Sequence, residues 1–389
     1  MWKNTIPKHK PLDRYRYKFI HRIGFRDDAR IVVVTADRIM RSQNKQVSDV
    51  QPRIEKQMTL ITEQSIRPAD LMSKKQACVV ADRNYLLDRR DEWVVVPCPA
   101  CQEASYQDYG QKDGISYVSC NRCDTIYTNP RPSLNLLHEF YAQSENYAFW
   151  NQHIFPATET ARRERIFKPR AERLDQFCSK FDIQSGTFLE IGAAFGTFCQ
   201  EVDQLQRFEQ VIGVEPTPGL AETCRNRGIE TKECFVEQIE GREFARVIAA
   251  FEVIEHLFAP RDFVRTSERL LEPGGLLILS CPNAKGFDVA TLGMQSGTFD
   301  HEHLNYFNPK SLSNLAESCG LDVLEVQTPG QLDVDLVRTA VEQGRCDLSD
   351  QPFLQSVIVD GFEELGKTFQ EYLAQNCLSS HLWIVARKR

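Results

Sequence analysis

The chain has 389 residues, of which 42% are hydrophobic and 26% are charged, so it has an ordinary globular composition and room for two or more domains. Its formal net charge of −7 at pH 7 argues against broad nucleic-acid binding and leaves only local basic patches for such a role. The sequence shows neither an apolar run long enough to cross a bilayer nor the apolar core of a signal peptide, so we expect a cytoplasmic protein without a membrane span. The sequence does not indicate an oligomeric state.

Residues 1–91 form an N-terminal extension to which the sequence assigns no role. Nine Lys or Arg residues and only three Asp residues fall within the first thirty. Such a basic arm either contacts phosphates or an anionic surface, or is a solvated extension. A run of four β-branched residues within 29–36 predicts a strand.

Two Cys-x-x-Cys pairs organise residues 92–132. The pairs are Cys98 with Cys101 and Cys120 with Cys123, and each follows a β-prone run, at residues 92–96 and 117–119. Two thiolates separated by two residues fit adjacent tetrahedral positions on Zn²⁺, and two such pairs leave no position for a substrate. The spacing therefore predicts a small zinc ribbon with a structural Zn²⁺. The alternative is unligated core cysteines or redox cysteines.

Residues 133–185 are predicted to be a helical linker or lid. Ser133 can cap a first helix, and a second helical segment starts at Pro156 and is broken or kinked at Pro169. Between them, the aromatic and polar segment 145–150 either covers a ligand or packs in the core. Six Arg and Lys residues between 162 and 173 give the second segment a basic face, which is either solvated or binds phosphate.

A strand, a tight turn and a helix are predicted around Gly192 and Gly196. An apolar run over 187–191 enters the turn, and apolar residues at helical spacing follow it. Glycine at such a turn takes positive φ and lets backbone N–H groups approach a ligand at a helix N-terminus. The turn therefore predicts a site for a nucleotide-like ligand.

Strands and helices alternate through residues 186–389. Further strands are predicted over residues 210–215, 229–234, 244–251, 276–280, 321–326 and 381–386. A mostly helical insert at about 329–380 separates the last two. This alternation implies an α/β fold in which helices cover both faces of a parallel sheet.

An acid about twenty residues beyond the glycine turn narrows the choice of ligand. Glu215 ends the next predicted strand, where a carboxylate can accept hydrogen bonds from both hydroxyls of a ribose. The dinucleotide fingerprint G-x-G-x-x-G would require glycines at the positions of Ala194 and Thr197, so NAD is disfavoured.

The order of these features resembles that of the class I S-adenosylmethionine-dependent methyltransferases, closely over residues 188–281. The resemblance rests on the acid before the turn, the glycines within it, the acid after the second strand, and the Phe-Glu-Val-Ile-Glu-His segment at residues 251–256. It implies a Rossmann-like, mostly parallel sheet with an antiparallel edge strand, for which residues 381–386 are the candidate.

The same resemblance implies S-adenosylmethionine as the cofactor. Its methionine part would lie over the glycine turn, its ribose at the strand-two acid, and its adenine near the residues that follow the third and fourth strands. The cofactor-binding positions carried over in this way are Glu190, Gly192, Ala194, Gly196, Glu215, Glu237 and Phe251.

The zinc pairs and a second motif make the chain similar to sugar C-methyltransferases of deoxysugar pathways and to related surface-polysaccharide enzymes. In these enzymes a cysteine-rich unit precedes the methyltransferase domain, which carries a Tyr-His-Glu-His segment. The corresponding residues here are Asp300, His301, Glu302 and His303, with Asp300 in place of the tyrosine. Because of this difference, C-, O- and N-methylation stay open.

The segment His301-Glu302-His303, called the HEH loop below, is predicted to lie at the carboxyl edge of the sheet, where open α/β sheets bind ligands. A histidine there can remove a proton from the acceptor, since its pKa lies near neutrality. The three side chains could act as base, orienting acid and substrate ligand, but could also cap the following helix or bind a metal. His256 is a further catalytic candidate, which contacts cofactor or acceptor or packs at a helix start.

These features predict an enzyme that transfers a methyl group to a small molecule. The expected acceptor is a nucleotide-linked sugar or another precursor of a surface glycan or natural product, with a histidine of the HEH loop as general base. One alternative is an RNA or protein methyltransferase recruited through the zinc ribbon. Another is a zinc-ribbon binding protein without catalysis.

Overall fold

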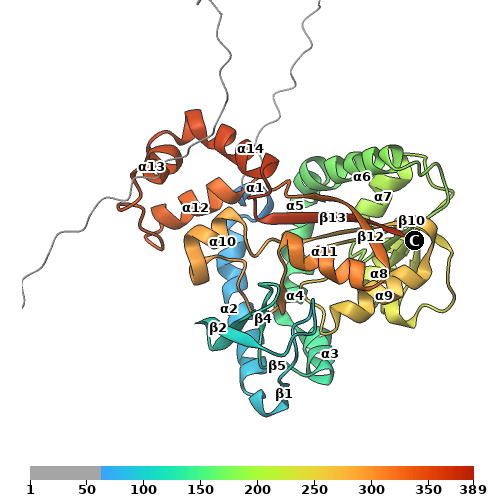
Figure 1. Cartoon of the computed structure of the whole chain (residues 1–389), viewed down its shortest axis with the longest axis horizontal. Helices are drawn as coiled ribbons and strands as arrows, with labels where there is room; N and C mark the ends of the chain where they lie inside the picture. The colour runs from blue at the N-terminus through green and yellow to red at the C-terminus, as the bar shows by residue number, and fades with distance from the viewer. Residues whose placement is uncertain (1–62) are drawn as a thin grey trace, which may run out of the picture. The chain divides into compact units, whose positions relative to one another are not determined.

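The computed structural model describes residues 63–389, and all of these belong to one compact unit (Figure 1). The predicted basic arm and the strand predicted over 29–36 lie outside the described residues. None of the helices in the described part is long and apolar enough to cross a membrane.

A seven-stranded sheet forms the centre of this unit. Its strands, from one edge to the other, are β12 (Leu321–Gln327), β13 (His381–Lys388), β10 (Leu271–Pro282), β9 (Ala245–Phe251), β6 (Thr187–Ile191), β7 (Gln210–Val214) and β8 (Glu230–Lys232). All neighbouring pairs are parallel except those that β13 makes with β10 and β12. The predicted mixed sheet of mostly parallel strands is therefore confirmed.

The predicted edge position of the antiparallel strand is wrong. β13 runs antiparallel as expected, but β12 pairs along its outer side and forms the edge. Burial explains why β12 and not β13 lies at the edge. Residues 382–386 of β13 are all buried, whereas β12 is mostly part-exposed. A continuous apolar strand suits the interior of a sheet, and a half-polar strand suits its edge.

Helices cover both faces of the sheet, as predicted. On one face lie α6 (Lys168–Lys180), α7 (Thr197–Gln204) and α8 (Pro218–Asn226), and on the other α9 (Pro260–Leu270) and α11 (Pro309–Ser318). Each layer has its own apolar core, with Phe198 and Leu174 on the first face and Phe263 and Leu315 on the second. This three-layer packing fixes the loops at the carboxyl ends of the parallel strands.

A second, smaller sheet contains strands from two distant parts of the chain. It has the order β11 (Asn305–Tyr306), β4 (Ile126–Thr128), β3 (Ile115–Cys120) and β2 (Tyr106–Lys112), all antiparallel. The strand predicted over 92–96 is shorter, since β1 covers Trp93–Val94 only and pairs with β5 (Arg131–Pro132). The fourth strand, β11, directly follows the HEH loop, so this loop is joined to the small sheet by backbone hydrogen bonds.

Helices before the main sheet are longer and more continuous than predicted. After α1 (Glu63–Ile66) and α2 (Ala69–Leu87), Ser133 caps α3 (Leu134–Gln143) as predicted, and α4 (Glu145–Phe149) and α5 (Phe155–Arg162) lead into α6. The helix predicted to be broken or kinked at Pro169 continues through a π-helical turn over Arg163–Phe167, and a second such turn, Trp150–Ile154, precedes Pro156. A proline lacks the N–H of the α-helical ladder, and the wider turn carries the helix past it.

The remaining helices lie between the last parallel strand and the C-terminus of the chain. α10 (Phe287–Leu292) precedes the HEH loop, and α12 (Asp333–Glu342), α13 (Pro352–Gln355) and α14 (Lys367–Gln375) make up the helical segment between β12 and β13. These helices share an apolar core of their own, which includes Val337, Ile358 and Leu373.

Candidate active site

The glycine turn joins β6 to α7, and its backbone requires glycine at two positions. Gly192 has φ of 78° and Gly196 has φ of 70°. A Cβ on Gly192 would come within 2.7 Å of Val253 Cγ2, so a side chain there would also collide with the loop after β9. Ala194 has a positive φ of 47°. The sequence therefore departs from glycine at a position where an L side chain is strained.

Glu215 connects the end of β7 to this turn. Its Oε2 accepts a hydrogen bond from Ala194 N at 2.8 Å, and its Oε1 accepts one from Thr217 N at 3.0 Å. The side chain is buried, and burial raises the pKa of Glu215. Each carboxylate oxygen keeps a lone pair beyond these backbone bonds, which a ribose hydroxyl could use.

Glu190, on β6, lies beneath the turn. Its Oε2 accepts a hydrogen bond from the thiol of Cys199 at 2.9 Å. The carboxyl group is 5% exposed, and burial raises its pKa to about 8, against the hydrogen bond from Cys199 and the positive charge of Arg170. The folded protein therefore favours the protonated form near neutral pH.

This burial predicts a pH-dependent stability for the protein without cofactor. The unfolded chain loses the Glu190 proton near pH 4.5 and the folded chain only near pH 8, so the free energy of unfolding falls as pH rises between these values. The slope is up to about 1.4 kcal/mol per pH unit. Glu190→Gln should flatten the slope in denaturant unfolding at pH 6 and pH 8, whereas Glu222→Gln, on the exposed side of α8, should keep it. Equal slopes in wild type and Glu190→Gln would contradict the prediction.

The other two carried-over cofactor positions lie apart from this group. Phe251 ends β9 with its ring packed against Phe198 and Trp383, at 5.0 Å from each. The guanidinium of Arg170 lies 4.4 Å from the centroid of the same ring. Glu237 is on an exposed 3₁₀ turn, Val236–Gln238, beyond β8. The turn glycines, Ala194, Glu190 and Glu215 thus come together, while Phe251 packs in the core and Glu237 faces solvent.

Asp300 shapes the HEH loop. Its Oδ1 accepts hydrogen bonds from the backbone N–H groups of Glu302 at 2.9 Å and His303 at 2.8 Å. Burial would raise the pKa of Asp300, but His303 and His301 beside it hold the pKa below its usual value. Asp300 therefore has a structural role at this position, because it closes the turn that presents both histidines.

His256 and His303 face each other across the carboxyl edge of the sheet. Their ring centroids are 4.7 Å apart. Nδ1 of His303 lies 2.8 Å from the carbonyl oxygen of Thr298, and Nδ1 of His256 lies 3.2 Å from that of Glu302. Since a carbonyl can only accept, both Nδ1 atoms carry a proton, and in the neutral form of each ring Nε2 keeps the lone pair. Burial lowers the pKa of His256 to about 3.

Glu255 is beside these histidines and is 1% exposed. Neither of its carboxylate oxygens has a hydrogen-bond partner within residues 63–389. Burial, together with the negative charge of Glu252, raises the pKa of Glu255 well above its usual value. A buried carboxyl group without partners is costly, and such groups concentrate at functional sites.

The remaining residues of the HEH loop face the N-terminal helices. His301 Nε2 lies 3.7 Å from Glu302 Oε1 and lacks a hydrogen-bond partner in the described part of the chain. Asn146 of α4 donates to Glu302, and burial raises the pKa of Glu302 to about 7. Burial also lowers the pKa of His301. The segment predicted either to cover a ligand or to pack therefore contacts the HEH loop.

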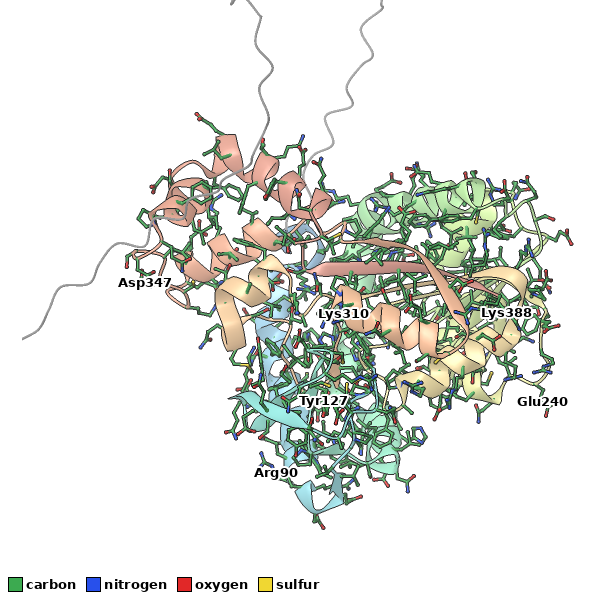
Figure 2. All side chains as sticks on the ribbon, in the orientation of Figure 1. Arg90, Tyr127, Glu240, Lys310, Asp347 and Lys388 are labelled. Carbon is green, nitrogen blue, oxygen red and sulfur yellow. The ribbon has the colours of Figure 1, made fainter. Side chains whose placement is uncertain are left out.

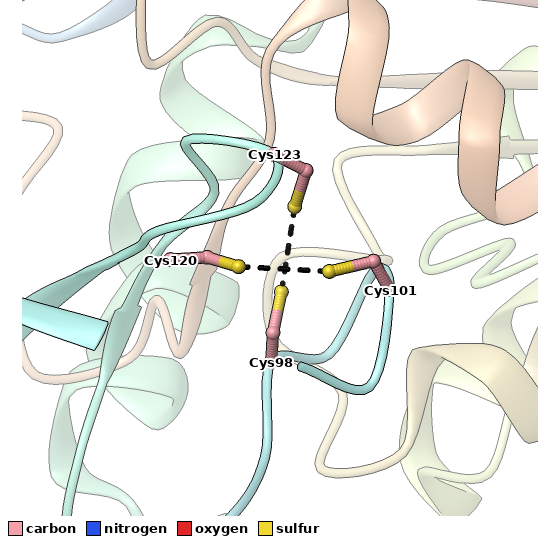
Figure 3. A group of neighbouring side chains, drawn as sticks. All are labelled: Cys98, Cys101, Cys120 and Cys123. Carbon is pink, nitrogen blue, oxygen red and sulfur yellow. Dashed lines mark hydrogen bonds between the residues drawn. The ribbon is translucent and has the colours of Figure 1, made fainter. Parts of the chain in front are cut away.

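The four cysteines predicted to bind zinc come together at the two knuckles of the small sheet (Figure 3). Cys98 Sγ is 3.6 Å from Cys123 Sγ, and Cys101 Sγ is 3.5 Å from Cys120 Sγ. Tyr127 of β4, labelled in Figure 2, is fully buried in the same core. All four sulfurs converge on one point, which is the arrangement of a tetrahedral metal site.

The cysteine knuckles are also attached to the helix that follows the HEH loop. Asn308 caps α11 by accepting a hydrogen bond from Ser311 N at 3.0 Å. Its amide Nδ2 donates to the carbonyl oxygens of Cys123 and Asp124, both at 3.1 Å. The residue that starts the helix therefore also fixes the second cysteine pair.

A known protein family matches the segment that contains the glycine turn and the HEH loop. Residues 161–326 match a family model described as a methyltransferase domain. This segment contains the glycine turn, Glu215, the loop after β9 and the HEH loop. Over these residues the chain is similar to methyltransferase domains.

The names of two similar proteins indicate methyl transfer to different kinds of atom, carbon in one and oxygen in the other. The C-methyltransferase NovU of Streptomyces niveus is 32% identical over 126 residues, which cover 31% of this chain and 29% of that protein. A ubiquinone biosynthesis O-methyltransferase of Bradyrhizobium diazoefficiens is 30% identical over 115 residues, covering 28% of this chain and 45% of that protein. The chain thus spans less than half the length of these two relatives.

A solved structure of phosphoethanolamine N-methyltransferase 2 from Haemonchus contortus with S-adenosyl-L-methionine is also similar. It is 15% identical, has a TM-score of 0.36, and is matched over 53% of this chain and 49% of that chain.

Sequence reasoning missed two arginines around the methyltransferase domain. Arg170 reaches from α6 to the Phe251 ring, and within a run of six basic residues nothing singled it out. Arg131 is fully buried and donates to the carbonyl oxygens of Thr128, Leu304 and Phe258. Its position between two prolines in the sequence does not indicate this role. Because Leu304 follows the HEH loop and Phe258 follows β9, Arg131 ties the small sheet to the HEH loop and to the loop after β9.

Proposed function

We propose that the chain transfers a methyl group from S-adenosylmethionine to a small molecule, such as a nucleotide-linked sugar or a precursor of a surface glycan or natural product. The observation that carries this proposal is the placement of the glycine turn, Glu215 and the HEH loop at one edge of one sheet. Open α/β sheets bind their ligands at this edge. A cytoplasmic location stays a prediction.

In this proposal the glycine turn and Glu215 bind different parts of the cofactor. The turn from Gly192 to Gly196 takes the methionine part, and Glu215 accepts the ribose hydroxyls. Arg170, whose guanidinium lies near Glu190 and Glu252, adds a positive charge close to the turn. Glu237 and Phe251 keep their proposed place near the adenine, although the first is exposed and the second is packed.

The HEH loop supplies the acid–base chemistry in this proposal. Methyl transfer from a sulfonium is an in-line displacement, so its rate depends on holding the acceptor behind the methyl group. A hydroxyl acceptor, or a carbon next to a ketone, must also lose a proton. The ring of His301 or His303 can accept it, Glu302 can orient them, and His256 can contact cofactor or acceptor.

Zn²⁺ bound by Cys98, Cys101, Cys120 and Cys123 would complete the small sheet as a zinc ribbon. A tetrahedral ion with zinc–sulfur bonds of 2.3 Å has sulfur–sulfur edges of about 3.8 Å. The observed separations of 3.5 and 3.6 Å fit such a site. Four thiolates leave no open position, so this ion would stabilise the ribbon and take no part in the reaction.

Methyl transfer from labelled S-adenosylmethionine tests the proposed function. The full chain should label a nucleotide-sugar pool or another small-molecule pool. His301→Ala or His303→Ala should lower turnover by about 100-fold or more, since general base catalysis contributes roughly 10²–10⁴-fold. The control His153→Gln, on an exposed position, should keep full turnover. Label in RNA or protein would favour the recruited-polymer alternative, and full turnover in both loop variants would remove the HEH loop from catalysis.

A further inference from the structure

Three side chains at the carboxyl edge of the sheet form a cluster with the composition of a metal site. Glu255, His256 and His303 each offer one ligand atom, and these atoms lie within 4.8 Å of one another. Two backbone hydrogen bonds bring the separate segments together, because the carbonyl oxygen of Glu255 accepts from Leu304 N at 2.8 Å and Asn305 N at 3.0 Å. The cluster is therefore fixed by the fold.

The two histidines make the kind of outer hydrogen bond that metal-bound histidines make. Each donates its Nδ1 proton to a backbone carbonyl, His303 to Thr298 and His256 to Glu302. This outer hydrogen bond fixes the tautomer and leaves Nε2 as the free lone pair. Metal-bound histidines almost always show this arrangement.

Glu255 supplies the independent observation that a ligand is expected here. Its carboxyl group is 1% exposed, and both oxygens lack partners among residues 63–389. The surroundings are acidic, since Glu252 and Asp300 lie close enough to disfavour the ionised form of Glu255. A cation would offset this repulsion and give the carboxylate a partner, whereas the protein groups described do neither.

We propose that Glu255, His256 and His303 bind a divalent transition-metal cation, and that this cation holds an oxygen atom of the methyl acceptor. Two imidazoles and one carboxylate suit Mn²⁺, Fe²⁺, Co²⁺ or Zn²⁺. Three protein ligands leave coordination positions open, in contrast to the four cysteines of the ribbon. In this proposal the oxygen that the cation holds belongs to a hydroxyl group, and methylation takes place on that oxygen.

The methyl-transfer step rests on the proposed function, and cation binding does not. In that step the acceptor hydroxyl loses its proton to a loop residue that the cation leaves free, His301 or Glu302. The new oxygen–carbon bond forms as the sulfur–carbon bond of the sulfonium breaks, which releases S-adenosylhomocysteine and one proton. A bound cation lowers the pKa of the hydroxyl that it holds.

Mn²⁺ binding to the full chain tests the site without cofactor or acceptor. Mn²⁺ is the suitable probe because thiolate sites such as the ribbon select softer metals. Electron paramagnetic resonance titration should detect one bound Mn²⁺ per chain. Glu255→Gln and His303→Ala should each weaken binding at least tenfold, and the control His153→Gln should leave it unchanged. Thermal unfolding should show that Glu255→Gln, which keeps the shape of the side chain, is folded.

The outcomes separate the two proposals. Absence of Mn²⁺ binding, or undiminished binding in Glu255→Gln and His303→Ala, would overturn the cation site whatever the activity. Full methyl transfer after removal of loosely held metal by a chelator, with the ribbon zinc retained, would overturn the acceptor-holding role and leave the proposed function intact. Cation binding without any methyl transfer would support the site and contradict the proposed function.

Discussion

Cys98→Ser is expected to abolish zinc binding and to lower methyl transfer by about 100-fold or more, although no cysteine of the ribbon belongs to the acceptor site. Structural Zn²⁺ contributes on the order of 10 kcal/mol to folding small zinc units. Without Zn²⁺, β4 should lose its fixed position. This affects β11 as well, because β11 pairs directly with β4. The HEH loop immediately precedes β11, so its histidines should lose their orientation.

Three measurements on the same variant check this expectation. Zinc content should fall from one atom to none per chain, the melting temperature should drop, and hydrogen exchange should speed up at residues 300–306. Cys377→Ser is the matched control, because Cys377 is exposed and lies outside the cluster. Retention of zinc in Cys98→Ser would contradict the metal assignment. Loss of zinc with unchanged exchange at the HEH loop would contradict the coupling between ribbon and loop.

Glu215→Ala is expected to weaken S-adenosylmethionine binding by roughly 30- to 1,000-fold. The carboxylate would accept two charge-assisted hydrogen bonds from the ribose, worth about 2–4 kcal/mol together. The variant also removes the acceptor of Ala194 N, so the glycine turn loses a support. Glu215→Gln keeps the size and one acceptor oxygen, and should fall between wild type and Glu215→Ala.

Calorimetry with S-adenosylmethionine and with S-adenosylhomocysteine measures this effect. Glu222→Ala serves as the control, since that residue lies exposed on the neighbouring helix α8. The ratio of affinities for the two ligands should stay constant, because the ribose is common to both. Binding by Glu215→Ala equal to that of wild type would remove Glu215 from the cofactor site.

Local patterns predicted most of the main sheet and the position of the cofactor turn. The apolar runs of β6, β7, β9 and β10 are continuous because both of their faces are covered, and such runs are visible in one sequence. The glycines at 192 and 196 were predictable because the backbone there takes positive φ. These features depend on neighbouring residues alone.

Features that depend on distant residues were not predictable. β11 has two residues, too few to show a pattern, and exists because β4 pairs with it across about 180 positions of sequence. The position of β12 at the edge of the sheet was not predictable either, because it depends on which strands pair with β13. The partnerless state of Glu255 likewise depends on which distant segments surround it, and a Glu beside a His in a sequence does not indicate it.

The shared sheet of β2, β3, β4 and β11 limits how this protein can be recombined with its relatives. A chimaera that exchanges only residues 92–132 would place a foreign β4 against the original β11 and would remove Arg131 from the carbonyl groups of Phe258 and Leu304. A chimaera that also moves residues 299–309 keeps the pairing of β4 with β11 and the contact of Arg131 with Leu304. Domain-swapping experiments and inherited substitutions should therefore treat these two segments as one exchangeable block, although they are far apart in the gene.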